Sequence, residues 1–516
     1  MKTATITISL LILTAVLLMG VSPATAKTIK PLIKIDRPVI YADKAETVYV
    51  VVQFDIPKPQ IDKRHQSDLN IGLVLDRSGS MEEKGKMSYA KQAASFVVDQ
   101  MAYRDYLSIV EYDDQISVLW PSARVENKRI IKSRINELFP RGSTNLTGGM
   151  MSGVDEVLSS YQRRGINRVL LLSDGLANQG ITDPREIKRL VKKAKEKGIS
   201  ISTMGLGLNY NEDLMQLIAE YGGGNYYYIE HPRQMNSIFE QEIGTLFATV
   251  YKDMKAKVRT SRYVRDCKVF GYINDRDGST TSFDIGNIYS GEKLSVVCRL
   301  ELEPGSQGQV DLGYMEFEYF DMEDNSSKSY RSELKVKTSY DARSIELARN
   351  KEASAEAILV EADDFHDTQV RLFEEGKPEE AIKNIKTYAA TVGVMNQSLD
   401  NVLVEKKLEA LSMEADRIEM ADKDQEYRQS YLKSSKANAY QAKKGKRGMY
   451  LQQVGDSGLE VKNLQTALKD KGYYTGSIDG NFSEELKKSV MKFQEDNRIS
   501  VDGIAGPKTL QALGLY

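Results

Sequence analysis

The segment at residues 70–81, NIGLVLDRSGSM, constrains the fold of this chain more than any other. An uncharged apolar run over residues 71–75 is followed by Asp76, Ser78 and Ser80 at alternate positions. A short continuous apolar run predicts a strand buried on both faces, as in a parallel sheet between layers of helices. Polar groups just past such a strand lie where α/β sheets bind ligands. One carboxylate and two hydroxyls on a glycine-containing turn suit a hard divalent cation, which prefers oxygen ligands.

Two further segments could supply ligands to the same cation. Residues 141–146, RGSTNL, place Thr144 in a polar turn before an expected helix. Residues 168–175, RVLLLSDG, predict a second buried strand that ends on Asp174 and a glycine. Each polar residue also has a structural explanation, because serine and threonine often cap helices and Asp-Gly is a common turn pair. The metal hypothesis therefore depends on the three segments acting together.

Together the three segments resemble the metal-ion-dependent adhesion site of the von Willebrand factor type A family, whose motif is DxSxS…T…D. The matching residues are Asp76, Ser78, Ser80, Thr144 and Asp174. The resemblance implies that the three hydroxyls bind the ion directly, that the aspartates often act through water, and that a partner's Asp or Glu completes the octahedron. Mg²⁺ is the expected ion because it keeps waters and prefers octahedral geometry, with Mn²⁺ or Ca²⁺ as alternatives. The resemblance implies protein binding rather than catalysis.

Alternating strands and helices around these segments predict a doubly wound parallel sheet over residues 68–250. We expect helices over residues 86–102, 127–138, 147–161, 184–197, 211–221 and 234–247. We expect the remaining strands over residues 106–112, 116–120, 199–205 and 225–229.

Strand-like segments flank this α/β domain at residues 27–67 and 251–340. Their order predicts one β-sandwich into which the α/β domain is inserted. Cys267 and Cys298, the only cysteines of the chain, both lie in the later segment. A disulfide between them is expected if the protein is exported.

The first 26 residues predict export. They contain Lys2, an apolar run over residues 8–21 and the sequence Ala24-Thr25-Ala26, a pattern typical of a secretory signal peptide with cleavage after Ala26. The run is shorter than the about 20 residues of a membrane-spanning helix, and we expect no span in the mature chain. The net charge of −2 gives no indication of nucleic-acid binding. The expected location is the periplasm or cell wall of a bacterium.

The rest of the chain predicts helices and a small terminal module. Residues 341–441 are rich in Ala, Glu, Lys and Leu and predict two or three long helices that form a hairpin or spacer, followed by an exposed basic linker at 442–448. The tail, residues 449–516, contains the repeat DGNFSEEL and DGIAGPKT. It resembles the peptidoglycan-binding domain of bacterial wall hydrolases, except that Ser483 stands where that family usually has glycine. The resemblance implies that peptidoglycan is a partner.

These features favour an exported cell-envelope protein that binds a protein partner through a metal, is held to peptidoglycan by its tail and is not an enzyme. The alternative is an accessory or catalytic component of peptidoglycan remodelling, because such tails commonly accompany wall hydrolases. A zinc hydrolase needs clustered His, Asp or Cys ligands. His65, His231 and His366 are far apart in the sequence, which argues against that class.

Overall fold

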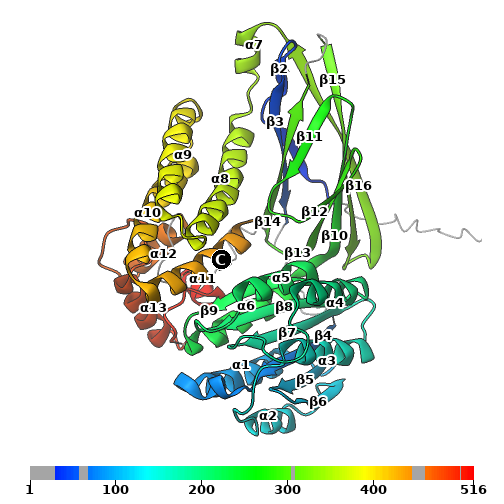
Figure 1. Cartoon of the computed structure of the whole chain (residues 1–516), viewed down its shortest axis with the longest axis vertical. Coiled ribbons are helices and arrows are strands. Elements are labelled where there is room, and N and C mark those ends of the chain that lie inside the picture. Colours follow the sequence, from blue (N-terminus) through cyan, green and yellow to red (C-terminus); the bar gives the residue numbers. More distant parts are fainter. Residues whose placement is uncertain are drawn as a thin grey trace, which may run out of the picture.

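The computed structural model describes residues 29–56, 68–303, 308–443, 452, 459–499 and 501–515. The expected signal peptide lies outside the described residues, as do residues 444–448 of the expected basic linker. Figure 1 shows an α/β unit at the bottom, a β-sandwich above it and helices along one side. The terminal module lies beside the α/β unit.

A six-stranded sheet with the order β6-β5-β4-β7-β8-β9 forms the centre of the α/β unit. Its strands are β4 (Leu69–Asp76), β5 (Tyr106–Tyr112), β6 (Ile116–Arg124), β7 (Ile166–Ser173), β8 (Ser200–Leu206) and β9 (Gly223–Ile229). Neighbouring strands are parallel except that β6 runs antiparallel to β5 at one edge. The apolar strands β4 and β7 are buried along their whole length, because helices cover both faces. The predicted doubly wound sheet is confirmed.

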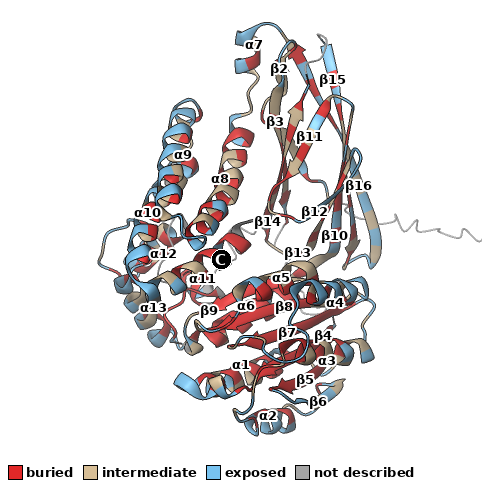
Figure 2. Ribbon diagram, in the orientation of Figure 1, coloured by how far each residue is buried: buried red, intermediate tan, exposed pale blue. Residues whose placement is uncertain are grey.

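Two layers of helices cover this sheet, and Figure 2 shows the buried residues that fill the space between them. One face packs against α1 (Lys86–Gln100), α2 (Lys128–Asn136) and α6 (Met235–Phe247). The other packs against α3 (Leu146–Ser159), α4 (Pro184–Glu196) and α5 (Glu212–Gly222). Helix α3 lies very close to β4, because a Cβ atom on Gly153 would be only 2.3 Å from Val74 Cγ2.

The β-sandwich is formed by strands from both sides of the α/β unit. Its two sheets have the orders β1-β3-β14-β11 and β12-β13-β10-β15-β16-β2. The strands are β1 (Leu32–Ile35), β2 (Val39–Tyr41), β3 (Glu46–Asp55), β10 (Thr249–Thr260), β11 (Val264–Val269), β12 (Asn274–Asp277), β13 (Thr280–Tyr289), β14 (Lys293–Leu302), β15 (Gly308–Asp321) and β16 (Ser326–Ser339). Strand β3 pairs along its length with β14, with Val50 opposite Cys298. The predicted insertion into a sandwich is confirmed.

The predicted disulfide is wrong for this structure, because Cys267 and Cys298 are free, buried thiols. In the ladder between β11 and β14, Cys267 lies opposite Leu300 and Cys298 lies opposite Val269. The two cysteines are therefore diagonal neighbours, whose Cα atoms are typically about 7–8 Å apart. Disulfides usually need a Cα separation below about 6.8 Å. Burial raises the pKa of the Cys267 thiol to about 11, which disfavours the reactive thiolate.

The helical segment contains more helices than predicted. A short α7 (Ala342–Leu347) precedes four long helices: α8 (Lys351–Glu374), α9 (Pro378–Leu399), α10 (Val402–Lys423) and α11 (Gln425–Lys443). The break before α9 contains Gly376, which adopts a left-handed conformation. A second break was missed because it needs only Asp400, which adopts a left-handed conformation, and Asn401, whose side chain caps α10. Ala442 and Lys443, assigned to the linker in the sequence, belong to α11.

This helical segment contacts the β-sandwich and the α/β unit, so it is more than a spacer. Helix α8 packs on the sandwich, where Ala357 and Val360 share a core cluster with Val51 and Val297. Helix α11 lies along the edge strand β9, and the Tyr440 hydroxyl donates a hydrogen bond of 3.0 Å to the carbonyl of Gly224. In the described part of the chain, no helix has the length and apolar composition needed to cross a membrane.

The tail folds around α12 (Leu459–Asp470), α13 (Glu484–Asp496) and α14 (Pro507–Leu513). Its sequence repeat is also a structural repeat. Gln465 Nε2 donates to Asp479 Oδ1 at 2.7 Å, and Gln494 Nε2 donates to Asp502 Oδ1 at 2.8 Å. Ser483, the departure from the family pattern, caps α13 by accepting a hydrogen bond from the Leu486 amide.

Candidate metal centre

The order of the central sheet reverses between β4 and β7. From β4 the chain moves to β5 and β6 on one side, and from β7 it moves to β8 and β9 on the other. The carboxyl ends of two such strands open the crevice where α/β sheets bind ligands. Asp76 is the last residue of β4, Asp174 directly follows β7, and both are fully buried. The two carboxylates therefore lie at the binding crevice of the sheet.

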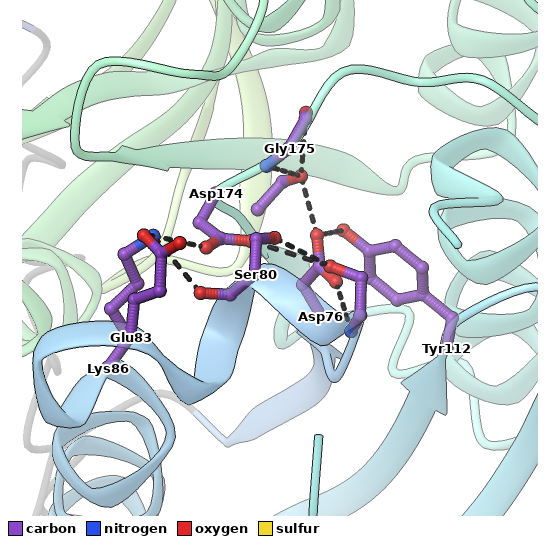
Figure 3. Close-up of polar contacts among 9 residues, drawn as sticks. Asp76, Ser80, Glu83, Lys86, Tyr112, Asp174 and Gly175 are labelled. Carbon is purple, nitrogen blue, oxygen red and sulfur yellow. Dashed lines mark hydrogen bonds and ion pairs between the residues drawn. The ribbon is translucent and has the colours of Figure 1, made fainter. Parts of the chain in front are cut away.

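The loop after β4 brings two hydroxyls to these carboxylates (Figure 3). The Ser78 amide donates to Asp76 Oδ1 at 2.8 Å, and Ser80 Oγ donates to Asp174 Oδ1 at 2.7 Å. The hydroxyls of Ser78 and Ser80 are 3.2 Å apart. Ser78 stands at the N-cap of the 3-10 helix Gly79–Gly85, and Gly85 stands at that of α1. Neither of these described residues makes a side-chain capping hydrogen bond, so neither serine side chain is explained as a helix cap.

Thr144 reaches the same place from the loop between α2 and α3. Asn145, not Thr144, caps α3 by accepting a hydrogen bond from the Gly148 amide. A Cβ atom on Gly175 would lie 2.9 Å from Thr144 Oγ1 and 3.7 Å from Ser80 Oγ. Both hydroxyls therefore lie beside Gly175, and any larger residue there would crowd them. The structure thus brings together all five residues singled out in the sequence.

Three polar neighbours of the site were missed in the sequence. Ser173 Oγ donates to Asp76 Oδ2 at 2.8 Å. The Tyr112 hydroxyl lies 3.3 Å from the same oxygen and 2.9 Å from the carbonyl oxygen of Leu172. Lys86 Nζ donates to Asp174 Oδ2 at 2.6 Å. Tyr112 could have been found from strand register, because it lies opposite Asp76 at the end of β5. Lys86 has no comparable signal, since its side chain reaches the site only through the turn before α1.

The electrostatics of the site fit a divalent cation. Burial, with the nearby Asp174 carboxylate, raises the pKa of Asp76 from its usual 3.8 to about 6. Two buried carboxylates repel each other, and a cation between them would relieve that repulsion. The candidate ligands are three hydroxyls and two carboxylates, an all-oxygen set of the kind preferred by Mg²⁺ and Mn²⁺. The residues present therefore suit a hard ion.

The described histidines lie in segments other than those that carry the five candidate ligands. His366 on α8 places Nε2 2.7 Å from Glu414 Oε1 on α10. Although burial alone would raise it, the pKa of Glu414 is lowered to about 2 by His366 and Arg417. His231 precedes a short 3-10 helix before α6, and His65 lies outside the described residues.

Comparison with known families gives two matches along the chain. Residues 70–241 match the family described as "von Willebrand factor type A domain". Residues 457–513 match the family described as "Putative peptidoglycan binding domain". The first match contains all five candidate ligands, and the second covers most of the tail.

Individual relatives agree with the first match. The chain is 31% identical over 248 residues to "Uncharacterized protein YfbK" of Escherichia coli, an alignment covering 47% of this chain and 43% of the relative. It is 24% identical over 270 residues to "Uncharacterized protein sll0103" of Synechocystis, covering 50% of this chain and 63% of the relative. The chain thus spans about half the length of these curated relatives.

A solved structure extends the likeness of fold. The structure titled "von Willebrand factor type A from Catenulispora acidiphila" superposes with a TM-score of 0.58 at 14% identity. The superposition covers 77% of this chain and 90% of that one, so the shared fold extends beyond the α/β unit. The chain therefore contains a von Willebrand factor type A domain at residues 70–241 and a domain of the peptidoglycan-binding family at residues 457–513.

Proposed function

We propose that this chain is an exported cell-envelope protein that captures a protein partner through a divalent metal ion and is held to peptidoglycan by its tail. The observation that carries the proposal is the meeting of Asp76, Ser78, Ser80, Thr144 and Asp174 at the switch point of the sheet. Mg²⁺ or Mn²⁺ is the proposed ion because all candidate ligands are oxygen atoms.

The residues of the site would have different roles in binding such an ion. The hydroxyls of Ser78, Ser80 and Thr144 are neutral donors. The carboxylates of Asp76 and Asp174 balance charge. Ser173 orients Asp76 by donating to its Oδ2 atom, while Oδ1 accepts from the Ser78 amide. When bound, the ion supplies an electrophilic centre for an Asp or Glu carboxylate of the partner.

The surface near the site supports a protein as the partner. Leu176, directly after Gly175, is 58% exposed, and Phe139 is 56% exposed. The Arg141 guanidinium lies 5.8 Å from the centre of the Phe139 ring, and the Arg141 amide donates to the carbonyl of Arg77 in the loop after β4. Phenylalanine and arginine are enriched in protein interfaces, whose centres are more apolar than the rest of the surface.

A capture experiment with matched threonine variants tests the metal-dependent half of the proposal. The mature chain, residues 27–516, is used as bait for an envelope extract in Mg²⁺ or in EDTA. Wild type and Thr147→Ala should retain the partner in Mg²⁺, because the Thr147 hydroxyl donates to the carbonyl of Ile181 outside the ligand set. EDTA and Thr144→Ala should each abolish retention. Capture that is unchanged by both treatments would contradict the proposal.

Sedimentation with purified sacculi tests the wall-binding half. The full mature chain should pellet with sacculi, whereas a chain ending at residue 448 should remain in the supernatant. The folded state of the shortened chain is checked by its melting curve. If it pellets as completely as the full chain, wall attachment resides outside the tail.

A further inference from the structure

A buried lysine lies beside the candidate metal centre. Lys86 is the first residue of α1, and its side chain is 7% exposed. Its Nζ atom lies 2.6 Å from Asp174 Oδ2 and 3.2 Å from the carbonyl oxygen of Ser80 (Figure 3). Lysine is rarely buried unless its charge is compensated, and the positive end of a helix dipole disfavours a cation at this position. The buried carboxylates must therefore outweigh both effects.

The charge around Lys86 comes mainly from the site itself. Asp174 contacts the Lys86 ammonium directly. The Asp76 carboxylate, which interacts electrostatically with Asp174, adds a second negative charge to the site. Glu83 Oε2 lies 3.9 Å from the ammonium, but the Glu83 side chain is 65% exposed, so solvent screens its charge. Lys86 is thus paired chiefly with a candidate ligand of the ion.

The hydrogen bonds of Asp174 separate the lysine from the hydroxyls. Asp174 Oδ1 accepts from Ser80 at 2.7 Å and lies 3.5 Å from Ser78 Oγ, whereas Oδ2 accepts from Lys86. Lys86 therefore contacts a different oxygen of Asp174 from the one that the serine hydroxyls approach, and it also donates to the Ser80 carbonyl. An ion among the hydroxyls and the Lys86 ammonium can be present at the same time, one on each side of the carboxylate.

We propose that Lys86 is a permanent counter-charge of the metal centre, which weakens binding of the divalent ion and increases its attraction for a carboxylate ligand. This inference rests on the proposed metal site. The two carboxylates contribute −2 and Lys86 contributes +1, so an ion of charge +2 brings the centre to +1. Without Lys86 the occupied centre would be neutral, would retain the ion more tightly and would attract the carboxylate of a partner less.

Titration of the full mature chain with Mn²⁺, followed by the electron paramagnetic resonance signal of free Mn²⁺, tests the first consequence. Lys86→Gln keeps a hydrogen-bond donor and removes the charge, and Lys86→Met removes both. Both variants should bind Mn²⁺ about tenfold more tightly or better, because a unit positive charge so near a divalent ion is strongly unfavourable. Lys86→Arg keeps the charge and should stay close to wild type. The matched control is Lys91→Met, since Lys91 on the same helix is partly exposed and donates to the carbonyl of Asn136.

Fluoroacetate tests the second consequence as a simple carboxylate probe. With Mn²⁺ saturating in every sample, the ¹⁹F relaxation enhancement of fluoroacetate should be several-fold larger for wild type than for Lys86→Gln. Melting curves establish that each variant is folded. If either Lys86→Gln or Lys86→Met fails to fold, the other variant is used to test the loss of charge.

The outcomes separate this inference from the proposed function. Unchanged or weaker Mn²⁺ binding by both Lys86→Gln and Lys86→Met contradicts the counter-charge, as does a fluoroacetate effect that is equal or larger in the variants. Weaker binding by Lys86→Met with normal binding by Lys86→Gln would show that Lys86 only positions Asp174. If neither wild type nor the Lys86 variants bind Mn²⁺, the proposed metal site itself is wrong and the inference falls with it.

Discussion

The ionisation of Asp76 affects the stability of the metal-free protein. Its pKa is raised to about 6 in the folded chain, by burial first and by Asp174 second, against an ordinary value of 3.8. The folded state therefore holds a proton that the unfolded state has lost between these pH values. The contribution of Asp76 to the free energy of unfolding should therefore decrease as the pH rises from about 4 to 6 and stay low above that range.

Asp76→Asn should remove this dependence. In EDTA, the variant should melt at a higher temperature than wild type at pH 7, because the repulsion with Asp174 is gone. It should also lack the increase in melting temperature that Mg²⁺ gives to wild type, since a ligand bound only by the folded state stabilises that state. Melting curves at pH 4 and pH 7, with and without Mg²⁺, measure both effects. A variant that Mg²⁺ stabilises as much as wild type would exclude Asp76 as a ligand.

The five candidate ligands could be predicted from the sequence because each follows a recognisable apolar strand or polar turn. Their supporting residues could be predicted only in part. Ser173 and Tyr112 follow from strand ends and register, whereas Lys86 depends on the exact path of the turn at Gly79–Gly85. Three-dimensional contacts made by a long flexible side chain leave no periodic signal in the sequence.

Among the elements, helix α3 depends on glycine for its close approach to the sheet. Gly153→Ala would place a methyl group 2.3 Å from Val74 Cγ2. We expect it to destabilise the chain by about 1–3 kcal/mol, the usual effect of overpacking, although alanine favours helices. Gly244→Ala in α6 is the matched control, because a Cβ atom there meets no atom within 4 Å. It should stabilise the chain by up to about 1 kcal/mol. Chemical denaturation measures both, and an equal effect of the two variants would contradict the packing described for α3.

The elements also show where local sequence patterns succeed and fail. Strand β5 (Tyr106–Tyr112) was predicted to the residue, because it is apolar and bounded by polar turns. The helical segment was predicted with too few helices, since the turns at Asp400 and Asp424 are one or two residues long within a helix-favouring composition. The disulfide was wrong because residue spacing does not give the cross-strand register of two cysteines.

At the scale of the whole molecule, helix α11 joins the helical segment to the edge of the type A domain. Tyr440 is 2% exposed, and its ring meets that of Tyr226 edge-on with centroids 5.9 Å apart. Lys433 Nζ donates to the carbonyl of Tyr210 at 2.8 Å and pairs with Glu212. These contacts cross between segments more than 200 residues apart, and no local pattern in the sequence predicted them.

Tyr440→Ala should therefore loosen the joint without unfolding the type A core. We expect the free energy that holds α11 against β9 to decrease by about 3–5 kcal/mol, as it does when other large aromatic residues are truncated in a core. Tyr440→Phe keeps the ring and loses only the hydrogen bond to Gly224, so its effect should be about 1 kcal/mol. Hydrogen exchange should increase in β9 and α11 for the alanine variant and remain slow in β4. Unchanged exchange in β9 would show that α11 does not hold that edge.

The tail also contacts the type A domain. Ser237 on α6 donates a hydrogen bond to Asp502 in the second Asp-Gly turn. The first turn, at Asp479, has the same internal hydrogen bonds without a described contact to α6. The resemblance to wall-binding domains could be predicted from the tail sequence, but the docking of one turn of the repeat against another domain could not.

Crystals of the mature chain soaked in Mn²⁺ test the central claim most directly, because anomalous scattering locates the ion without reference to any partner. We expect one strong peak between Asp76 and Asp174, within bonding distance of the hydroxyls of Ser78, Ser80 and Thr144, and no such peak in crystals of Asp76→Asn. A peak at another place, with none among these five residues in wild type, would contradict the metal centre on which the proposed function depends.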